Sequence, residues 1–187
     1  VSLLLLASAH GPTTLVAVPA LETRGDAVAW QTSEWTLRGL PEVSNPFDPD
    51  EMAVDLVVRA PDGGERRIPA FWFQAFERSL VEGVQQLAPK GAPEWRVRIT
   101  PTDAGMHEAA LVVSRRGFVD TPTPLLRFEV APASKPFHGW SRVSADGRTL
   151  VTSDGVPLLL VGANVCWGGA RATYDYDEWL PALRAHG

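Results

Sequence analysis

In the stretch MAVDLVVRA, residues 52–60, a large apolar residue stands at every second position from Met52 to Val58. Successive side chains of an extended chain point to opposite faces, so its apolar positions gather on one face. Alternation of this kind is typical of a strand with one buried face. The buried face is expected to carry Met52, Val54, Leu56 and Val58. Three later stretches repeat the pattern: WRVRIT (95–100), HEAALVVSR (107–115) and LLRFEV (125–130).

The segments between these stretches are rich in turn-forming residues. Pro, Gly, Asn, Asp and Ser recur in NPFDPD, PDGG, PTDAG, SRRG and DTPTP. Short alternating strands separated by such turns predict a mainly β fold, an antiparallel β-sandwich. The segment SLVEGVQQLAPKG, residues 79–91, is the exception, and we interpret it as a loop with room for one helical turn.

The pattern changes after APASKPFHG, residues 131–139, which we interpret as a linker. The pair Asp154 and Gly155, typical of a tight turn, then separates two strand-like runs. The second run, residues 156–161, is apolar at every position. A strand that is buried on both faces has this composition, as in a parallel sheet or a barrel.

The stretch YDYDEWLPALRAHG, residues 174–187, predicts a helix. Asp175 and Asp177 are of a type that caps helix N-termini, and Gly187 suits a C-terminal cap. Pro181 is expected in or near the first turn, where its missing N–H costs nothing. Strand, loop and helix form one β/α unit, on which a parallel β/α fold cannot close. The apolar stripe of the helix consists of Trp179, Leu180 and Leu183.

Composition argues against several classes of protein. Seventeen basic and 22 acidic residues give a net charge of −5, which does not suit a nucleic-acid-binding surface. No run approaches the ~18 apolar residues of a membrane-spanning helix. The single cysteine, Cys166, allows no internal disulfide, and we interpret it as a small buried apolar residue rather than a nucleophile. Most of the seven Trp are interpreted as core residues, with one or two sugar-stacking platforms as the alternative.

The N-terminus resembles the end of a secretory signal peptide. An apolar run at residues 3–6 is followed by Ala7-Ser8-Ala9, which matches an A-x-A cleavage site. A first strand that runs into a loop is the alternative interpretation. The signal peptide predicts a secreted or extracellular protein.

Several motifs in the β-rich part resemble those of one known family. They are NPF at residues 45–47, PAFWF at residues 69–73 and W-x-V-R-x-x-P…G at residues 95–105. Together they resemble an immunoglobulin-like domain of unassigned function that often precedes secreted cellulase-type glycoside hydrolases. The tyrosine- and aspartate-rich segment usual after PAFWF is replaced by QAFERSLVEGVQQ, residues 74–86.

The last part of the chain resembles the start of the (β/α)8 barrel of the same enzymes. There a strand ends in Gly-x-Asn-x-x-Trp, here residues 162–167, and a helix ends in Gly, here Gly187. The resemblance covers residues 34–187. It implies an immunoglobulin-like β-sandwich at 34–132, a linker and entry strand at 133–148, and a barrel fragment at 149–187. Residues 1–33 are then expected to form a leader with the signal peptide remnant.

No catalytic residue is assigned within this chain. Glycoside hydrolysis needs two carboxyl groups on either side of the scissile bond, and the resemblance places both catalytic glutamates on later barrel strands. Asn164 and Trp167, at the C-terminal end of the expected barrel strand, are the candidate substrate-binding residues. A turn-forming Asn and a core Trp are the alternative. No cofactor or metal is expected, since the four histidines are scattered without metal-ligand spacing: His10, His107, His138 and His186.

These observations predict the N-terminal part of a secreted glycoside hydrolase that acts on polysaccharide. The sandwich is expected to pack on its own barrel rather than to bind sugar, because Trp72 and Trp95 lie in runs that point them inward. The alternative is a non-catalytic module, a sandwich that binds carbohydrate or has only a structural role. A sandwich fold by itself does not decide between them.

Overall fold

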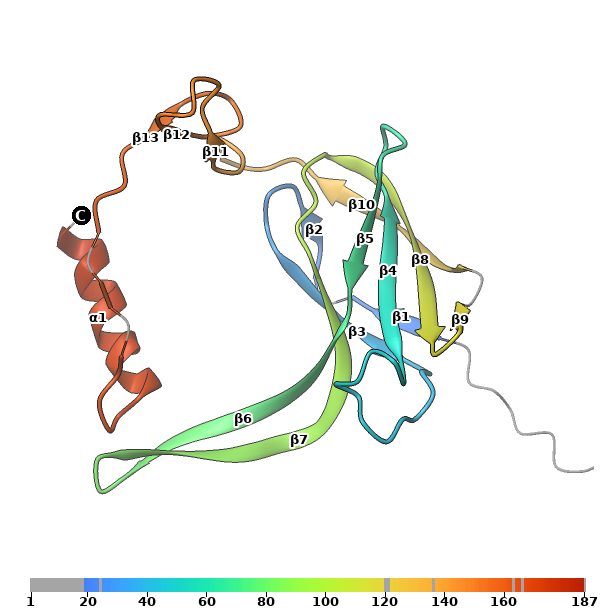
Figure 1. Cartoon of the computed structure of the whole chain (residues 1–187), viewed down its shortest axis with the longest axis horizontal. Coiled ribbons are helices and arrows are strands. Elements are labelled where there is room, and N and C mark those ends of the chain that lie inside the picture. Colours follow the sequence, from blue (N-terminus) through green and yellow to red (C-terminus); the bar gives the residue numbers. More distant parts are fainter. Residues whose placement is uncertain are drawn as a thin grey trace, which may run out of the picture.

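The computed structural model describes residues 19–186, apart from Arg24, Asp120, Thr121, Pro136, Ala163 and Cys166. The predicted signal-peptide segment, Cys166 and Gly187 therefore lie outside the described residues. The described part is mainly β, with antiparallel pairing in all of its strand pairs but one. Figure 1 shows two larger sheets, a small third sheet and one helix.

The first sheet has four strands in the order β1-β3-β7-β6, and all neighbours are antiparallel. Its N-terminal strand pairs residue by residue with β3, from Ala20 opposite Arg38 to Glu22 opposite Thr36. Strand pairing thus starts ahead of the boundary expected at residue 34. The strands are β1 (Ala20–Glu22), β3 (Ser33–Arg38), β6 (Phe71–Val81) and β7 (Val84–Ile99).

The second sheet has six strands, five of them in the order β2-β10-β8-β4-β5, with β9 paired to β8. Only β2 and β10 are parallel in the described part of the chain. The strands are β2 (Ala27–Val28), β4 (Ala53–Arg59), β5 (Glu65–Pro69), β8 (Gly105–Arg115), β9 (Phe118–Val119) and β10 (Thr123–Ala131).

The core lies between these two sheets, where the alternating faces of both meet. The alternation predicted for residues 52–60 is confirmed, since Met52, Val54, Leu56 and Val58 are all buried. One cluster joins Trp35 and Val97 of the first sheet to Leu56 of the second. A neighbouring cluster contains Leu37, Met52, Val54, Trp95, Leu111 and Val113.

The loop predicted at residues 79–91 is wrong, because β6 and β7 continue through it as a hairpin. Pairing runs without interruption from Ala75 opposite Lys90 to Val81 opposite Val84. Glu82 and Gly83 form the two-residue turn with φ of 51° and 78°, as a type I′ hairpin turn requires. Both faces of this ribbon are largely exposed, so its sequence lacks the alternation that marks a half-buried strand. We call residues 75–90 the ribbon.

The third sheet is small, with three antiparallel strands in the order β11-β12-β13. The turn predicted at Asp154 and Gly155 is confirmed, and the Val156 amide nitrogen donates to Thr152 Oγ1. The strand buried on both faces at residues 156–161 is wrong. Only Pro157 and Leu158 of this run are in a strand, β13 is an edge of the small sheet, and Leu159 and Val161 are exposed among the described residues. The strands are β11 (Arg142–Val143), β12 (Leu150–Val151) and β13 (Pro157–Leu158).

The predicted helix is present as α1 (Thr173–His186). It begins before Asp175, so Pro181 lies well inside it, and the first-turn placement of Pro181 is wrong. Pro181 has no N–H to donate to the carbonyl four residues earlier, and this region of the helix is exposed. No helix in the described part of the chain is long and apolar enough to cross a membrane.

Candidate functional site

Asn164 and Trp167 lie in the segment that joins β13 to α1. Together with Val165 and with Trp179 of α1 they surround an open pocket of about 420 Å³. The structure thus brings the two predicted binding residues to one place. Trp167 is 87% exposed, so in this chain it is not a core residue.

The segment around Trp167 is held against the start of α1. A Cβ at Gly168 would lie 2.5 Å from the carbonyl oxygen of Ala172, so glycine is needed there for the close approach. The next amide, of Gly169, donates to Asp175 Oδ2 at 2.7 Å. Asp175 is thus a buried member of the first helical turn that also fixes the preceding loop.

Trp72 and Trp95 belong to the core side of the first sheet. Trp95 is 8% exposed, and its ring centroid lies 5.5 Å from that of the partly buried Trp72, at an interplanar angle of 64°. An edge-to-face pair of this kind uses the rings for packing. Trp95 therefore presents no open face on which a sugar could stack.

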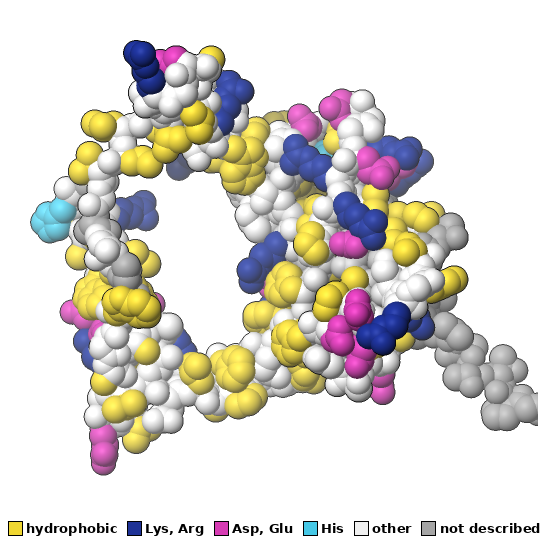
Figure 2. Space-filling model, in the orientation of Figure 1, with side chains coloured by type: hydrophobic (Ala, Val, Ile, Leu, Met, Phe, Trp, Pro, Cys, Tyr) yellow, Lys and Arg dark blue, Asp and Glu magenta, His cyan; other side chains and the backbone are white. Residues whose placement is uncertain are grey.

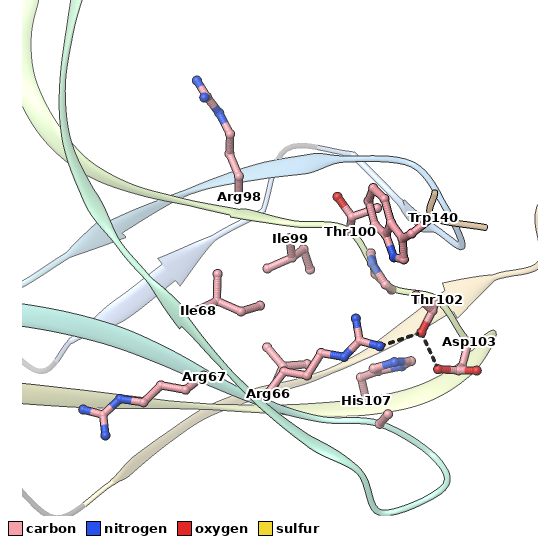
Figure 3. Close-up of a pocket in the computed structure, with 13 residues that line it drawn as sticks. Arg66, Arg67, Ile68, Arg98, Ile99, Thr100, Thr102, Asp103, His107 and Trp140 are labelled. Atoms are coloured by element: carbon pink, nitrogen blue, oxygen red, sulfur yellow. Dashed lines mark hydrogen bonds between the residues drawn. The ribbon is translucent and has the colours of Figure 1, made fainter. Parts of the chain in front are cut away.

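A second pocket, which sequence reasoning missed, lies at the end of the two large sheets beside the linker (Figure 3). Its volume is about 480 Å³. Strands β4, β5, β7 and β8, the loop after β7 and Trp140, which directly follows the linker, contribute to it. Its main polar and aromatic residues are Arg66, Thr102, Asp103, His107 and Trp140. We call it the Trp140 pocket.

A short chain of hydrogen bonds crosses this pocket. Arg66 Nη2 donates to Thr102 Oγ1 at 3.3 Å, and that hydroxyl donates to Asp103 Oδ2 at 2.6 Å. Figure 3 shows the Arg66 guanidinium pointing inward, whereas Arg67 and Arg98 point away. A cationic donor and an anionic acceptor thus stand side by side in the pocket.

The two other arginines are neutralised by partners outside the pocket. Arg67 forms an ion pair with Asp55 at 2.7 Å, and Arg98 pairs with Glu34 at 2.5 Å. Burial opposes ionisation of Glu34, but the hydrogen bonds from Arg98 and Arg96 hold its pKa below the ordinary value. The net charge available inside the pocket is therefore that of Arg66 and Asp103 together.

His107 forms a buried part of the pocket wall. The residue is only 2% exposed, and its ring stacks on Phe128 with the ring centroids 5.3 Å apart. The Nδ1 atom lies 3.1 Å from the carbonyl oxygen of Gly105, which can only accept, so Nδ1 is the donor. In the neutral ring Nε2 is then an acceptor. In the described part of the chain the buried side-chain nitrogen or oxygen atom without a hydrogen-bond partner is Trp35 Nε1, so His107 Nε2 is not an unpaired buried atom.

Trp140 is fixed in place by its backbone and by other aromatic rings. Its amide donates to Ser153 Oγ at 3.0 Å, and Ser153 Oγ donates back to the Trp140 carbonyl at 3.1 Å. Gly139 has φ of +81°, and a Cβ there would lie 2.5 Å from that of Ser153. Trp30 meets the Trp140 ring at 62° and Phe137 meets it at 80°, both in edge-type contacts. The indole stays 54% exposed.

The tip of the ribbon contacts the N-terminal end of α1. Arg78 donates to Thr173 Oγ1 at 2.9 Å and to Asp177 Oδ2 at 2.8 Å, and its guanidinium carbon lies 4.6 Å from the centre of the Tyr174 ring. Gln85 Oε1 accepts the Thr173 amide at 2.9 Å, and the Gln85 amide donates to the Ala170 carbonyl at 3.0 Å. The ribbon therefore supplies a hydrogen-bond partner to an amide of the first helical turn.

Linear sequence gives little sign of the Trp140 pocket. Its polar and aromatic residues come from two strands, one loop and the position after the linker, and no spacing rule joins positions 66, 103, 107 and 140. The exposed Trp next to the Pro- and Gly-containing linker is the one local signal. Among the described residues no group of His, Cys, Asp and Glu side chains could hold a metal ion.

Comparisons with protein-family models, with curated proteins and with solved structures find no match to this chain.

Proposed function

We propose that this chain is the N-terminal part of a secreted glycoside hydrolase that acts on polysaccharide. In this proposal the two large sheets form an immunoglobulin-like sandwich that supports a (β/α)8 barrel. Strand β13, the segment with Asn164 and Trp167, and α1 are the first unit of that barrel. The two catalytic glutamates belong to later strands of the barrel, as the family resemblance implies.

The contact between the ribbon and α1 is the observation that carries this proposal. Arg78 and Gln85 make five hydrogen bonds and an aromatic contact with residues 170–177, at the far end of an extended hairpin (Figure 1). An isolated two-stranded hairpin is marginally stable in water. A long ribbon that ends on the first barrel helix suits a support between a β domain and a catalytic domain.

The pocket between Trp167 and Trp179 is consistent with the same proposal. Substrate-contacting residues of barrel enzymes lie in the loops after the strands, and this segment follows β13 directly. In the proposed enzyme Trp167 stacks on a sugar ring and Asn164 hydrogen-bonds a hydroxyl or holds a catalytic carboxylate.

The test uses a longer protein that continues past residue 187. We expect two glutamates at the ends of later barrel strands, and release of reducing sugar from a soluble β-glucan, xylan or mannan. Replacing Trp167 with alanine should lower this activity more than it lowers the melting temperature. Following sequence without such glutamates, or an intact barrel without hydrolysis, would contradict the proposal and favour the non-catalytic carbohydrate-binding or structural module.

A further inference from the structure

We propose that the Trp140 pocket is a binding site for a neutral pyranose unit of a glycan chain. This site lies on the β-rich part and on Trp140, which follows the linker, away from the Trp167 pocket. The proposal goes beyond the function proposed above and does not depend on it, because binding at this site needs no catalytic barrel.

The first argument is the aromatic wall. Pyranose rings present an apolar C–H face, which packs on the face of an indole. Trp140 offers such a face, since it is 54% exposed and its two aromatic neighbours approach in edge-type contacts rather than stacked on it. Its backbone is held by Ser153, so little conformational entropy is lost when a ligand stacks.

The second argument is the set of polar groups opposite this wall. Sugar hydroxyls both donate and accept, so a matching site needs both kinds of partner. Arg66 supplies donors and Asp103 supplies acceptors, and the hydroxyl of Thr102 lies between them. Figure 3 shows these groups and Trp140 around the same space.

The third argument is the buried imidazole. His107 is buried, with only 2% of its surface exposed, and its Nδ1 donates to the carbonyl oxygen of Gly105. His107 lines the pocket, and with Nδ1 as the donor its Nε2 is an acceptor in the neutral ring. A ligand hydroxyl would find an acceptor in this atom, which favours a polar guest over an apolar one.

Charge balance favours a neutral guest over an anionic one. Among the described residues that line the pocket, Arg67 and Arg98 are engaged by Asp55 and Glu34, which leaves the charges of Arg66 and Asp103 facing a guest. A uronate would gain from Arg66 but would lie beside Asp103, and like charges this close are destabilising. An uncharged ring meets no such penalty.

The experiment is isothermal titration calorimetry of the 187-residue protein with cellohexaose, xylohexaose and mannohexaose, and with an oligogalacturonate as the anionic comparison. The test variants are Trp140→Ala and Asp103→Asn. The matched control is Phe118→Ala, which removes an aromatic side chain that is 62% exposed on β9, away from the pocket. Thermal melting of each variant shows that it is folded.

We expect at least one neutral hexaose to bind, with affinity reduced about tenfold or more, roughly 1.4 kcal/mol, by Trp140→Ala and by Asp103→Asn. Phe118→Ala should bind as the unmodified protein does. The indole N–H signal of Trp140 is assigned in nitrogen–proton NMR spectra as the signal that the Trp140→Phe variant lacks. In the unmodified protein this signal should shift when the hexaose is added. The proposal is overturned by no binding of any neutral hexaose, by binding that Trp140→Ala leaves unchanged, or by preference for the oligogalacturonate. None of these outcomes bears on whether a longer protein hydrolyses glycosides.

Discussion

Replacing Trp95 with alanine should destabilise the β-rich part severely and leave its surfaces unchanged. Trp95 is 8% exposed in a cluster with Leu37, Met52 and Leu111, and its ring packs against Trp72. The change removes a large side chain from between the two large sheets. Its effect should therefore act through folding rather than through a binding surface.

The magnitude follows from the area that is buried. A buried Trp removes about 200 Å² from water, which at about 25 cal/mol/Å² corresponds to about 5 kcal/mol. Alanine retains about 1 kcal/mol of this through its own methyl group. The difference of about 4 kcal/mol lies within the range of roughly 3–5 kcal/mol found for Trp and Phe replacements in cores. At about 4 °C per kcal/mol, the melting temperature should fall by roughly 12–20 °C.

The assay is thermal melting followed by circular dichroism, with a polysaccharide pull-down on the same samples. Trp167→Ala is the matched control, because its side chain is 87% exposed and its loss should change the stability by no more than about 0.5 kcal/mol. The reasoning would be refuted if Trp95→Ala melted within a few degrees of the unmodified protein but no longer bound a polysaccharide that the unmodified protein retained.

Three further predictions concern the ribbon, the turn at Asp154 and catalytic activity. Arg78→Ala should speed hydrogen exchange at the first amides of α1 and leave exchange in β4 unchanged. The control Lys90→Ala, which removes the ion pair with Glu77 within the ribbon, should leave exchange in α1 unchanged. Equal effects of both variants on α1 would count against the contact. Hydrogen bonds from Thr152 and His138 lower the pKa of Asp154 to about 2, so they should stabilise the turn above pH 3.8 and be lost as the pH falls through about 2. Carboxyl chemical shifts measured against pH should give that midpoint, and a Thr152→Val midpoint that does not rise would contradict the assignment. The 187-residue protein should release no product from an aryl glycoside above a blank, and turnover would show that catalytic groups lie within it.

The strands that bury one face were predictable from the sequence. In β4 and in the last part of β7, every second residue faces the core and must be apolar, so the sequence itself alternates. Residues 75–90 carry no such requirement, because they pair with each other and are exposed on both faces. Their only strong local signal is the Glu82-Gly83 turn.

The apolar run at residues 156–161 shows the opposite limit. Its composition is that of a doubly buried strand, yet Leu159 is 90% exposed and Val161 is 88% exposed. Composition reports the surroundings for which a segment is suited, whereas burial needs neighbouring strands and layers. The described part of this chain provides one strand beside β13 and none on its other edge.

The two candidate sites differ in the same way. Asn164 and Trp167 are three residues apart, so one strand-end motif was enough to place them around one pocket. The Trp140 pocket joins Arg66, Asp103 and His107 to a residue beyond the linker, and their meeting depends on how the sheets and the linker pack. Chain-distant constellations of this kind follow from the fold and not from spacing.

The ribbon connects these observations. Directly paired residues of an antiparallel hairpin share a face, so Arg78 and Leu87 lie on one side, with Leu80 and Gln85 beside them. This side meets α1 through Arg78 and Gln85, while Leu80 and Leu87 stay 44% and 55% exposed. Figure 2 shows an open space bordered by the ribbon, α1, the small sheet and the two large sheets. Apolar surface left around such a space is typical of a binding surface, and further elements of the proposed barrel are the partner that the sequence resemblance implies. In that case the contacts with the barrel would stabilise the ribbon, since an isolated two-stranded hairpin is only marginally stable in water.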